Sequence, residues 1–322
     1  MKSELSFINK ILRLFSRLFH SVWVVLFPVT YAKYYHKLTY SAQLNLNNPQ
    51  DYNEKVQWLK LYSDTTMWTI AADKYKVRDY VSQCGLKQIL TELYGVWDRP
   101  EDIDFNSLPN KFVLKTTNGC GKNILVHNKT KLDLLETKRV LKKWVKDRQG
   151  LISFQPHVWN IKRRIIAEEL LEDNSANDFS SSLIDYKFFC FHGEPEIIDV
   201  LYDRNNYVIG KCNKDGASRK EMLYDLNWNI RPEFLSSPPS SDFQVVIPKP
   251  MCLPEMISIC RILSEPFIQV RIDLYEVNGK VYFGELTFTP GEMNDFTNEY
   301  LLYLGSKIDL KRVDKRKTIF IV

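Results

Sequence analysis

Two carboxylates are the first side chains in this sequence whose types and spacing suggest chemistry. Asp273 and Glu285 lie in two apolar runs that flank Asn278-Gly279, a dipeptide typical of a tight hairpin turn. Antiparallel pairing of these runs can place the two acids side by side. Neighbouring carboxylates repel unless a cation lies between them, and Mg²⁺ prefers hard oxygen ligands, so the pair predicts a site for Mg²⁺ carrying nucleotide phosphates. Two solvated strand charges are the alternative, which the apolar neighbours disfavour.

A lysine and a glycine-containing loop precede these acids in the chain. Lys115 ends an apolar run, and Gly119 and Gly121 follow it. Such a loop can direct backbone N–H groups at phosphates while the lysine ammonium neutralises them. It is not a P-loop, because Lys122 is followed by Asn123 and no glycine stands at the required distance upstream. By themselves these residues would indicate an ordinary turn.

A third segment combines apolar and acidic residues. The run 165–167 is followed by Glu168 and Glu169 and then by Leu170 and Leu171. At the edge of a nucleotide pocket, such a segment can offer backbone groups and a carboxylate to adenine. It can equally be the cap of a helix.

The elements that must position these residues are predicted from the apolar periodicity. Residues 51–85 read as helical, as do 131–148 and 254–263. Six runs read as strands, at 111–115, 164–168, 186–191, 196–201, 267–274 and 279–286, with tight turns expected at His192-Gly193 and Asn278-Gly279. The pattern predicts an α+β fold with mixed antiparallel sheets and flanking helices. The proline- and serine-rich stretch 235–250 predicts a long loop or substrate flap.

The N-terminal segment has a different character. Between residues 7 and 22 apolar residues recur every three or four positions, with Lys10, Arg13 and Arg17 on the opposite side, which predicts an amphipathic helix. The apolar run that follows stops at Pro28 and is too short to cross a bilayer. Two interpretations stay open: the helix packs on the body, or residues 7–27 bind an anionic inner leaflet. A removed signal peptide is disfavoured, since no convincing cleavage site follows.

Composition limits the function classes. The chain has 322 residues, the length of about two compact domains, and 44% of them are hydrophobic, enough for a sizeable core. The net charge of +5 comes from residues 1–40, which hold six Lys/Arg against one acid, so the body is neutral and broad nucleic-acid binding is disfavoured. The six cysteines are scattered, which favours reduced thiols and a cytoplasmic location, with the inner membrane face as the site of any peripheral contact.

Taken in order, these features resemble the ATP-grasp enzymes. The resemblance is closest to the TupA-like ATP-grasp family of teichuronopeptide and surface-polysaccharide loci. The stretches that carry it are residues 52–62, 72–78, 185–193 and 224–228 and the motif Glu-Leu-Thr-Phe-Thr-Pro-Gly at 285–291, and they extend over roughly residues 50–295.

The resemblance implies a fold and a division of the chain. Two α+β subdomains would grip ATP between them, after an N-terminal amphipathic helix. Residues 1–40 would form the amphipathic segment and 41–85 a helical part of the body. Residues 86–170 would form the lid subdomain and 171–322 the catalytic subdomain.

The resemblance also assigns roles to individual residues. Lys74 and Lys115 would hold the ATP phosphates, Arg271 would stabilise charge at the reacting centre, and Thr287 stands where many relatives have a metal-binding Asn. The full implied sets are Arg271 and Lys115 for catalysis; Lys74, Lys115, Gly119, Gly121, Glu168, Glu169, Leu170, Asp185 and Lys187 for ATP; and Asp273, Glu285 and Thr287 for Mg²⁺.

The implied activity is that of a carboxylate–amine ligase working through an acylphosphate. Its expected substrates are a small-molecule or lipid-linked glycan carboxylate and an amino acid or amino sugar, in capsule, O-antigen or teichuronopeptide synthesis. A phosphotransferase on the same scaffold is the first alternative. A glycosyltransferase of a polysaccharide locus is the second, and no Asp-x-Asp beside a nucleotide-fold strand supports it. A non-catalytic tethered partner is disfavoured by Lys74, Lys115, Asp273 and Glu285.

Overall fold

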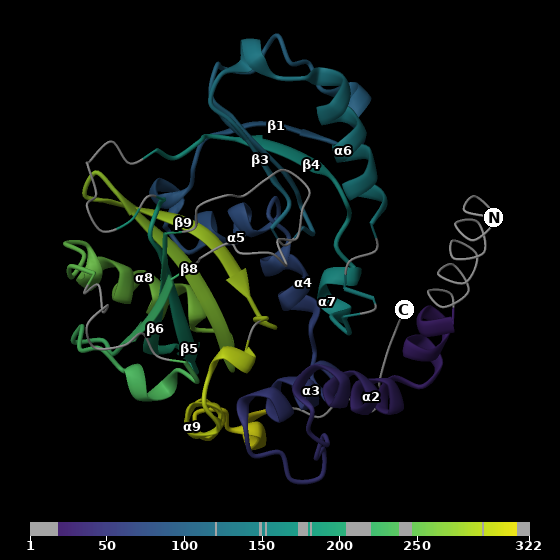
Figure 1. The fold of residues 1–322 in the computed structure, drawn as a ribbon, viewed down its shortest axis with the longest axis vertical. Helices are drawn as coiled ribbons and strands as arrows, with labels where there is room; N and C mark the ends of the chain where they lie inside the picture. The colour runs from purple at the N-terminus through teal and green to yellow at the C-terminus, as the bar shows by residue number, and fades with distance from the viewer. Residues whose placement is uncertain are drawn as a thin grey trace.

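The computed structural model describes residues 19–119, 121–147, 150–151, 153–172, 180, 182–203, 220–237, 247–291 and 293–313. Within them the chain forms two antiparallel sheets with helices packed around them (Figure 1). This is the expected α+β class. Residues 1–18 of the predicted amphipathic helix and residues 238–246 of the predicted long loop lie outside the described part.

The smaller sheet has four strands in the order β1-β4-β2-β3. Their bounds are β1 Leu93–Trp97, β2 Phe112–Thr116, β3 Asn123–Val126 and β4 Ile165–Glu168. Helix α6 (Leu134–Lys146) begins at Asp133, whose carboxylate accepts a hydrogen bond from the Glu136 amide and so satisfies a free N–H of the first turn. The buried side chains of Leu141 and Trp144 join this helix to the core of the small sheet.

The larger sheet has five strands in the order β7-β6-β5-β8-β9. Their bounds are β5 Asp185–Phe191, β6 Glu194–Tyr202, β7 Lys220–Tyr224, β8 Gln269–Val277 and β9 Lys280–Thr287. The two expected hairpin turns are confirmed at His192-Gly193 and Asn278-Gly279. All four residues have positive φ, which matches the twist of the flanking strands.

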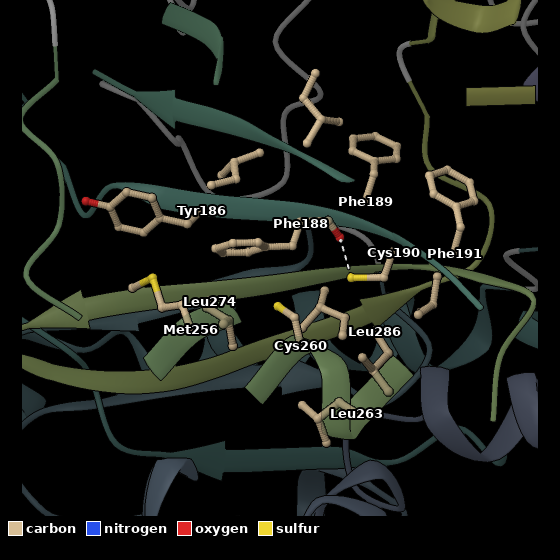
Figure 2. Close-up of a cluster of buried hydrophobic side chains, with 14 of the residues drawn as sticks. Tyr186, Phe188, Phe189, Cys190, Phe191, Met256, Cys260, Leu263, Leu274 and Leu286 are labelled. Carbon is tan, nitrogen blue, oxygen red and sulfur yellow. Dashed lines mark hydrogen bonds between the residues drawn. The ribbon is translucent and has the colours of Figure 1, made fainter. Parts of the chain in front are cut away.

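Helix α8 (Leu253–Ser264) covers one face of the larger sheet. Figure 2 shows Met256 and Cys260 directed toward Phe188 and Leu274, and all four side chains are buried. Because successive strand residues point to opposite faces, Lys187 and Phe189 on β5 lie on the other face. That second face therefore carries polar as well as apolar side chains.

Helices α3 (Tyr52–Tyr62) and α9 (Asn298–Ser306) cover part of that second face. The Tyr52 and Tyr300 rings both contact Phe189 edge-on. The two helices approach closely at Gly305, where a Cβ would lie 2.3 Å from the Gln50 carbonyl oxygen, so only glycine fits there.

The N-terminal helices pack on the body. Residues 19–26 are helical and lead into α2 (Pro28–Tyr40). Buried side chains of both segments, including Val24, Tyr31 and Ala32, pack with Leu61 of α3 and with Phe154. The remaining helices are α4 (Thr66–Ala72), α5 (Val77–Gln83) and α7 (Pro156–Trp159). No helix in the described part of the chain combines the length and the apolar character needed to cross a membrane.

Candidate functional site

A row of charged residues crosses the larger sheet. The register places Asp199 of β6 opposite Lys187 of β5, Lys187 opposite Asp273 of β8, and Asp273 opposite Glu285 of β9. The sequence-based expectation that Asp273 and Glu285 lie side by side is therefore confirmed. Since these strands run antiparallel with their partners directly opposite, the four side chains share one face.

The pairing of Asp273 with Glu285 depends on a bulge and on a glycine. The register between β8 and β9 shifts just after Asp273. A Cβ on Gly284 would lie 2.8 Å from the Asp273 carbonyl oxygen, closer than side chains can approach. Bulges of this kind redirect a side chain near a functional site. Gly284 thus allows the approach that keeps the two carboxylates together.

Asp273 is 2% exposed and is held by cations on two strands. Arg271 donates two hydrogen bonds to it in bidentate fashion, each 2.7 Å long, and the Lys187 ammonium lies 2.5 Å from its second oxygen. Lys187 also lies 2.7 Å from Asp185. Burial and Arg271 lower the pKa of Lys187, but Asp185 and Asp273 raise it by a larger amount. The net pKa of Lys187 is therefore above its usual range. Charge compensation of this kind is what buried ions require.

Glu285 is the exposed member of the pair, with 35% of its side chain accessible. Its carboxylate lies 2.5 Å from the Lys74 ammonium and 3.7 Å from the Arg271 guanidinium, and the Thr287 hydroxyl donates to it at 3.2 Å. Burial opposes its charge, but Lys74, Arg271 and Lys187 outweigh that effect and hold the pKa of Glu285 well below its usual range. Glu285 is therefore an ionised carboxylate that a ligand can reach.

Lys74 reaches Glu285 from the turn between α4 and α5. Asp73 shapes this turn by accepting hydrogen bonds from the backbone amides of Tyr75 and Lys76. The Lys74 amide donates to the Thr117 carbonyl at 3.1 Å, which ties the turn to the end of β2. The turn thus connects the two sheets and brings a cation to the carboxylate row.

Lys115 and Glu168 form a salt bridge between β2 and β4, and Arg78 of α5 lies 3.9 Å from the same carboxylate. These three residues, together with Lys74, line a hollow of about 300 Å³. Val77, Leu90, Phe283 and Gly284 also contribute to its wall. The hollow therefore has cations from the small sheet, from α5 and from the turn before it, beside apolar surface, a combination that suits a phosphate-bearing molecule with a flat ring.

The remaining predicted ATP ligands lie in different places. The Gly119 amide donates to the Thr116 carbonyl, and Gly121 has φ +63°, a region that favours glycine. Glu169 exchanges hydrogen bonds with Glu92 at the strand edge and does not line the hollow, and neither does Leu170. Asp185 belongs to the Lys187 ion-pair network of the large sheet. Cys120, between the two loop glycines, lies outside the described residues.

Two cations of the site were not singled out from the sequence. Arg78 reaches Glu168 and also donates to the Thr91 carbonyl. Arg164 lies 3.6 Å from Asp73 and stacks over the Tyr75 ring. Arg78 ends the stretch 72–78 that carries the family resemblance, but only the three-dimensional contacts reveal the role of either arginine.

Comparison with known proteins decides the family. The model of the TupA-like ATP-grasp family matches residues 54–309, which is most of the chain. The protein belongs to the TupA-like ATP-grasp family. It is therefore an ATP-grasp enzyme, as the sequence motifs led us to expect. A search of curated protein sequences gives no match.

Three of the solved structures that are similar to this ATP-grasp protein are ligases. D-alanine–D-alanine ligase from Bacillus anthracis has a TM-score of 0.49 and 15% identity, with 82% of this chain and 76% of that chain covered. D-alanine–D-alanine ligase from Helicobacter pylori has 0.39 and 13%, covering 80% and 68%. Phosphoribosylamine–glycine ligase from Thermotoga maritima has 0.39 and 14%, covering 76% and 51%. Because these TM-scores are below 0.5, the assignment to the ATP-grasp family rests on the family match alone.

The residues present fit a magnesium nucleotide. Among the described residues, no three His, Cys, Asp or Glu side chains gather into a metal site of their own. Asp273 and Glu285 supply two carboxylates, and Mg²⁺ characteristically takes its other ligands from substrate phosphates and water. An accessible, ionised Glu285 opposite Asp273, with the Lys74 ammonium available for phosphate oxygens, fits this mode of binding.

Proposed function

We propose that this ATP-grasp protein is a carboxylate–amine ligase that uses ATP and Mg²⁺. The observation that supports this best is the convergence of Lys74 and Lys115 on one hollow while Lys74 also reaches Glu285 of the acid pair. A triphosphate needs cations along its length and a metal at its end, and these residues supply both. Residues 86–170 would form the lid subdomain and residues 171–322 the catalytic one.

Each residue has a distinct role in this proposal. Lys74 and Lys115 neutralise phosphate oxygens in the hollow. Asp273 and Glu285, with the Thr287 hydroxyl hydrogen-bonded to Glu285, hold Mg²⁺, which when bound supplies Lewis acidity at the transferred phosphoryl group. Arg271 is fixed by its two hydrogen bonds to Asp273, so its charge is oriented before the reaction starts.

The proposed reaction has two steps. A carboxylate oxygen of the substrate bonds to the γ-phosphorus of ATP as the bond from that phosphorus to the bridging oxygen breaks, and ADP leaves. The nitrogen of a neutral amine then bonds to the acyl carbon, the acyl carbon–oxygen bond to phosphate breaks, and the nitrogen loses a proton. The products are an amide, ADP and phosphate.

We propose further that the substrates belong to cell-surface polysaccharide synthesis, with a uronic acid as carboxylate and an amino acid or amino sugar as amine. The description of the family as TupA-like is the support for this assignment. The reaction would take place in the cytoplasm. Exposed apolar residues near the N-terminus, Phe19, Leu26, Phe27 and Leu38, support contact with the inner membrane face.

The test is a screen for ADP and phosphate formation with pairs of uronic acids and amines, with products identified by mass. A ligase forms ADP in proportion to an amide and needs both substrates. Formation of a phosphoester without any amine would instead establish a phosphotransferase. Absence of ADP formation with every pair, by a protein that binds the acid, would contradict the ligase proposal.

A further inference from the structure

A second hollow, of about 670 Å³, lies between α2, α3 and the segment that follows β9. Tyr40 of α2 and Tyr52, Gln57 and Lys60 of α3 line it, opposite Gln155 and Thr289. Figure 1 shows α2 and α3 at the end of the molecule away from the small sheet. The residues that line this hollow differ from those that line the hollow with Lys74 and Lys115.

Lys60 is the unusual residue of this hollow. It is 6% exposed, and within the described part of the chain it has neither a hydrogen bond nor a carboxylate partner. Its ammonium lies 4.9 Å from the centre of the Phe154 ring. By contrast, Lys187, the buried lysine on β5 of the large sheet, is paired with two carboxylates. A buried ammonium without a counter-ion is costly, so Lys60 is a site where an anion would be stabilised.

A second polar group of the hollow also lacks a partner. The Gln57 side chain is 3% exposed, and its buried Oε1 has no hydrogen bond with any of the described residues. Asn53 and Gln57 line the hollow together with Lys60 at helical spacing, so one face of α3 presents two amides and an ammonium to it. Amide groups and tyrosine hydroxyls suit a ligand with several hydroxyl groups.

The ionisable groups around Lys60 provide little negative charge. His36 and His157 lie nearby. Burial lowers the pKa of His36 to about 4, with Glu54 opposing the shift and Lys60 adding to it, and burial and Lys60 lower the pKa of His157 to about 3, so both are neutral. Glu54 accepts hydrogen bonds from the backbone amides of Asn45 and Gln50. Burial also lowers the pKa of Lys60 to about 7. An anion entering the hollow would therefore restore the lysine charge.

The hollow is connected to the carboxylate row. Thr289 lies two residues after the end of β9, and the Gln155 side chain donates to its carbonyl at 3.4 Å. The Tyr52 hydroxyl donates to Gln269, which lies on β8 and donates in turn to the Phe288 carbonyl. A molecule in the hollow thus lies against the same two strands that carry Arg271 and Glu285.

The geometry points to this hollow as the binding site of the acid substrate, a polyhydroxylated carboxylate whose carboxylate pairs with Lys60 while Gln57 and the tyrosines bind its hydroxyl groups. This assignment rests on the proposed ligase function and names the substrate class for it. It adds a positioning residue on α3, far in the sequence from the ATP-binding residues.

The test is calorimetric binding without ATP, using D-glucuronate, D-glucose and D-glucose 6-phosphate as probes. These molecules share a sugar ring. Glucuronate carries a carboxylate, glucose carries no charged group, and glucose 6-phosphate carries a phosphate. The wild-type protein should bind glucuronate at least about tenfold more tightly than either other probe, which is about 1.4 kcal/mol. Equal binding of glucose would overturn the role of the charge. Tighter binding of the phosphate would overturn the choice of a carboxylate.

Variants assign the effect to Lys60. Lys60→Met keeps an unbranched side chain of similar length and removes the ammonium. Compared with wild type, it should bind glucuronate at least about tenfold more weakly and glucose equally well. Lys37→Met, on the exposed side of α2, is the matched control and should behave as wild type. Glucuronate affinity within about twofold of wild type in Lys60→Met would refute the site, provided that its circular dichroism spectrum is native.

Proton uptake gives an independent readout. At about pH 8, binding of a carboxylate should raise the pKa of Lys60, so the wild-type protein should take up a proton, measured in buffers of different ionisation enthalpy. His36 and His157 are far from their pKa values at this pH. Lys60→Met should show no uptake. Since these experiments contain no ATP, their failure would leave the ligase proposal standing, whereas that proposal fails if acid binds but no ADP forms.

Discussion

The ammonium of Lys74, in the turn between α4 and α5, lies 2.5 Å from the carboxylate of Glu285 on β9. The two residues are far apart in the sequence, and each belongs to the machinery proposed for ATP. In the structure they neutralise each other. In the proposed function, a bound magnesium nucleotide would replace this pair with Lys74–phosphate and Glu285–Mg²⁺ contacts.

Glu285→Gln should abolish ATP turnover. The substitution keeps the shape of the side chain and removes its charge, which leaves Asp273 as the sole carboxylate of the predicted metal site. We expect phosphate release to fall by at least about a hundredfold. Glu194→Gln, which changes an exposed acid paired with Arg261, is the control. Full turnover by Glu285→Gln would show that Glu285 does not hold the metal.

Arg271→Lys should affect the reaction more than nucleotide binding. A lysine cannot reproduce the bidentate hydrogen bonds to Asp273, so the orientation of the positive charge is lost. We predict a kcat lower by about a hundredfold and a dissociation constant for ATP within about threefold of wild type. Pre-steady-state ADP formation and equilibrium titration measure the two quantities. An unchanged kcat would mean that Arg271 serves only as a structural ion-pair partner of Asp273.

Gly284→Ala tests the bulge between β8 and β9. The added Cβ would press on the Asp273 backbone, which we expect to cost about 1–3 kcal/mol of unfolding free energy and to weaken Mg²⁺-dependent ATP binding. Urea unfolding and Mg²⁺ titration report on the two effects. Gly291→Ala is the stability control, because a Cβ there meets nothing within 4 Å. Equal stability of both variants would mean that the bulge tolerates a side chain.

Stability should depend on pH through Lys60. Its pKa is about 7 in the folded state and close to 10.5 in the unfolded chain, so the unfolded chain binds more protons between these values. The free-energy cost of burying Lys60 is therefore largest below pH 7, and the free energy of unfolding of the wild-type protein increases as the pH rises above 7. Lys60→Met should be more stable than wild type at about pH 6 by at least about 1.4 kcal/mol, with a smaller difference at about pH 9. A difference independent of pH would contradict this assignment.

The membrane proposal has its own test. Leu26 and Phe27 are exposed, whereas Tyr31 and Ala32 of the next helix are buried in the body. Replacing Leu26 and Phe27 with serine should therefore leave the fold intact and reduce sedimentation with vesicles that contain phosphatidylglycerol. Vesicles of phosphatidylcholine alone are the comparison for the anionic charge. Unchanged sedimentation would leave packing on the body as the only role of this segment.

Local pattern predicted the parts of the fold in which neighbouring residues decide the geometry. Asn278-Gly279 sets the register of β8 and β9 as far as Leu274 and Phe283, whereas the bulge beside Asp273, which brings Glu285 opposite it, was not predicted. The predicted helical stretch 51–85 is instead three helices, because Asp73 caps a turn that interrupts it. Strand β1 escaped prediction, since Gly95 interrupts its pattern.

The contacts between distant segments were beyond the reach of local pattern. Lys60 lies at helical spacing from Asn53 and Gln57, and nothing in the sequence indicates that these three polar residues are buried. Packing of α2 and of the segment around Phe154 buries this face of α3. The Lys74–Glu285 and Arg78–Glu168 pairs likewise depend on how the two sheets are placed.

The most direct test of the central claim is a calorimetric titration of the protein with ATP in the presence of Mg²⁺, comparing wild type with Lys74→Met and Lys115→Met. Both lysines line one hollow, so each substitution should weaken ATP binding by at least about tenfold, while Lys142→Met, which removes an exposed salt bridge on α6, should not. Wild-type affinity in both hollow variants would contradict the proposal that these residues hold the triphosphate.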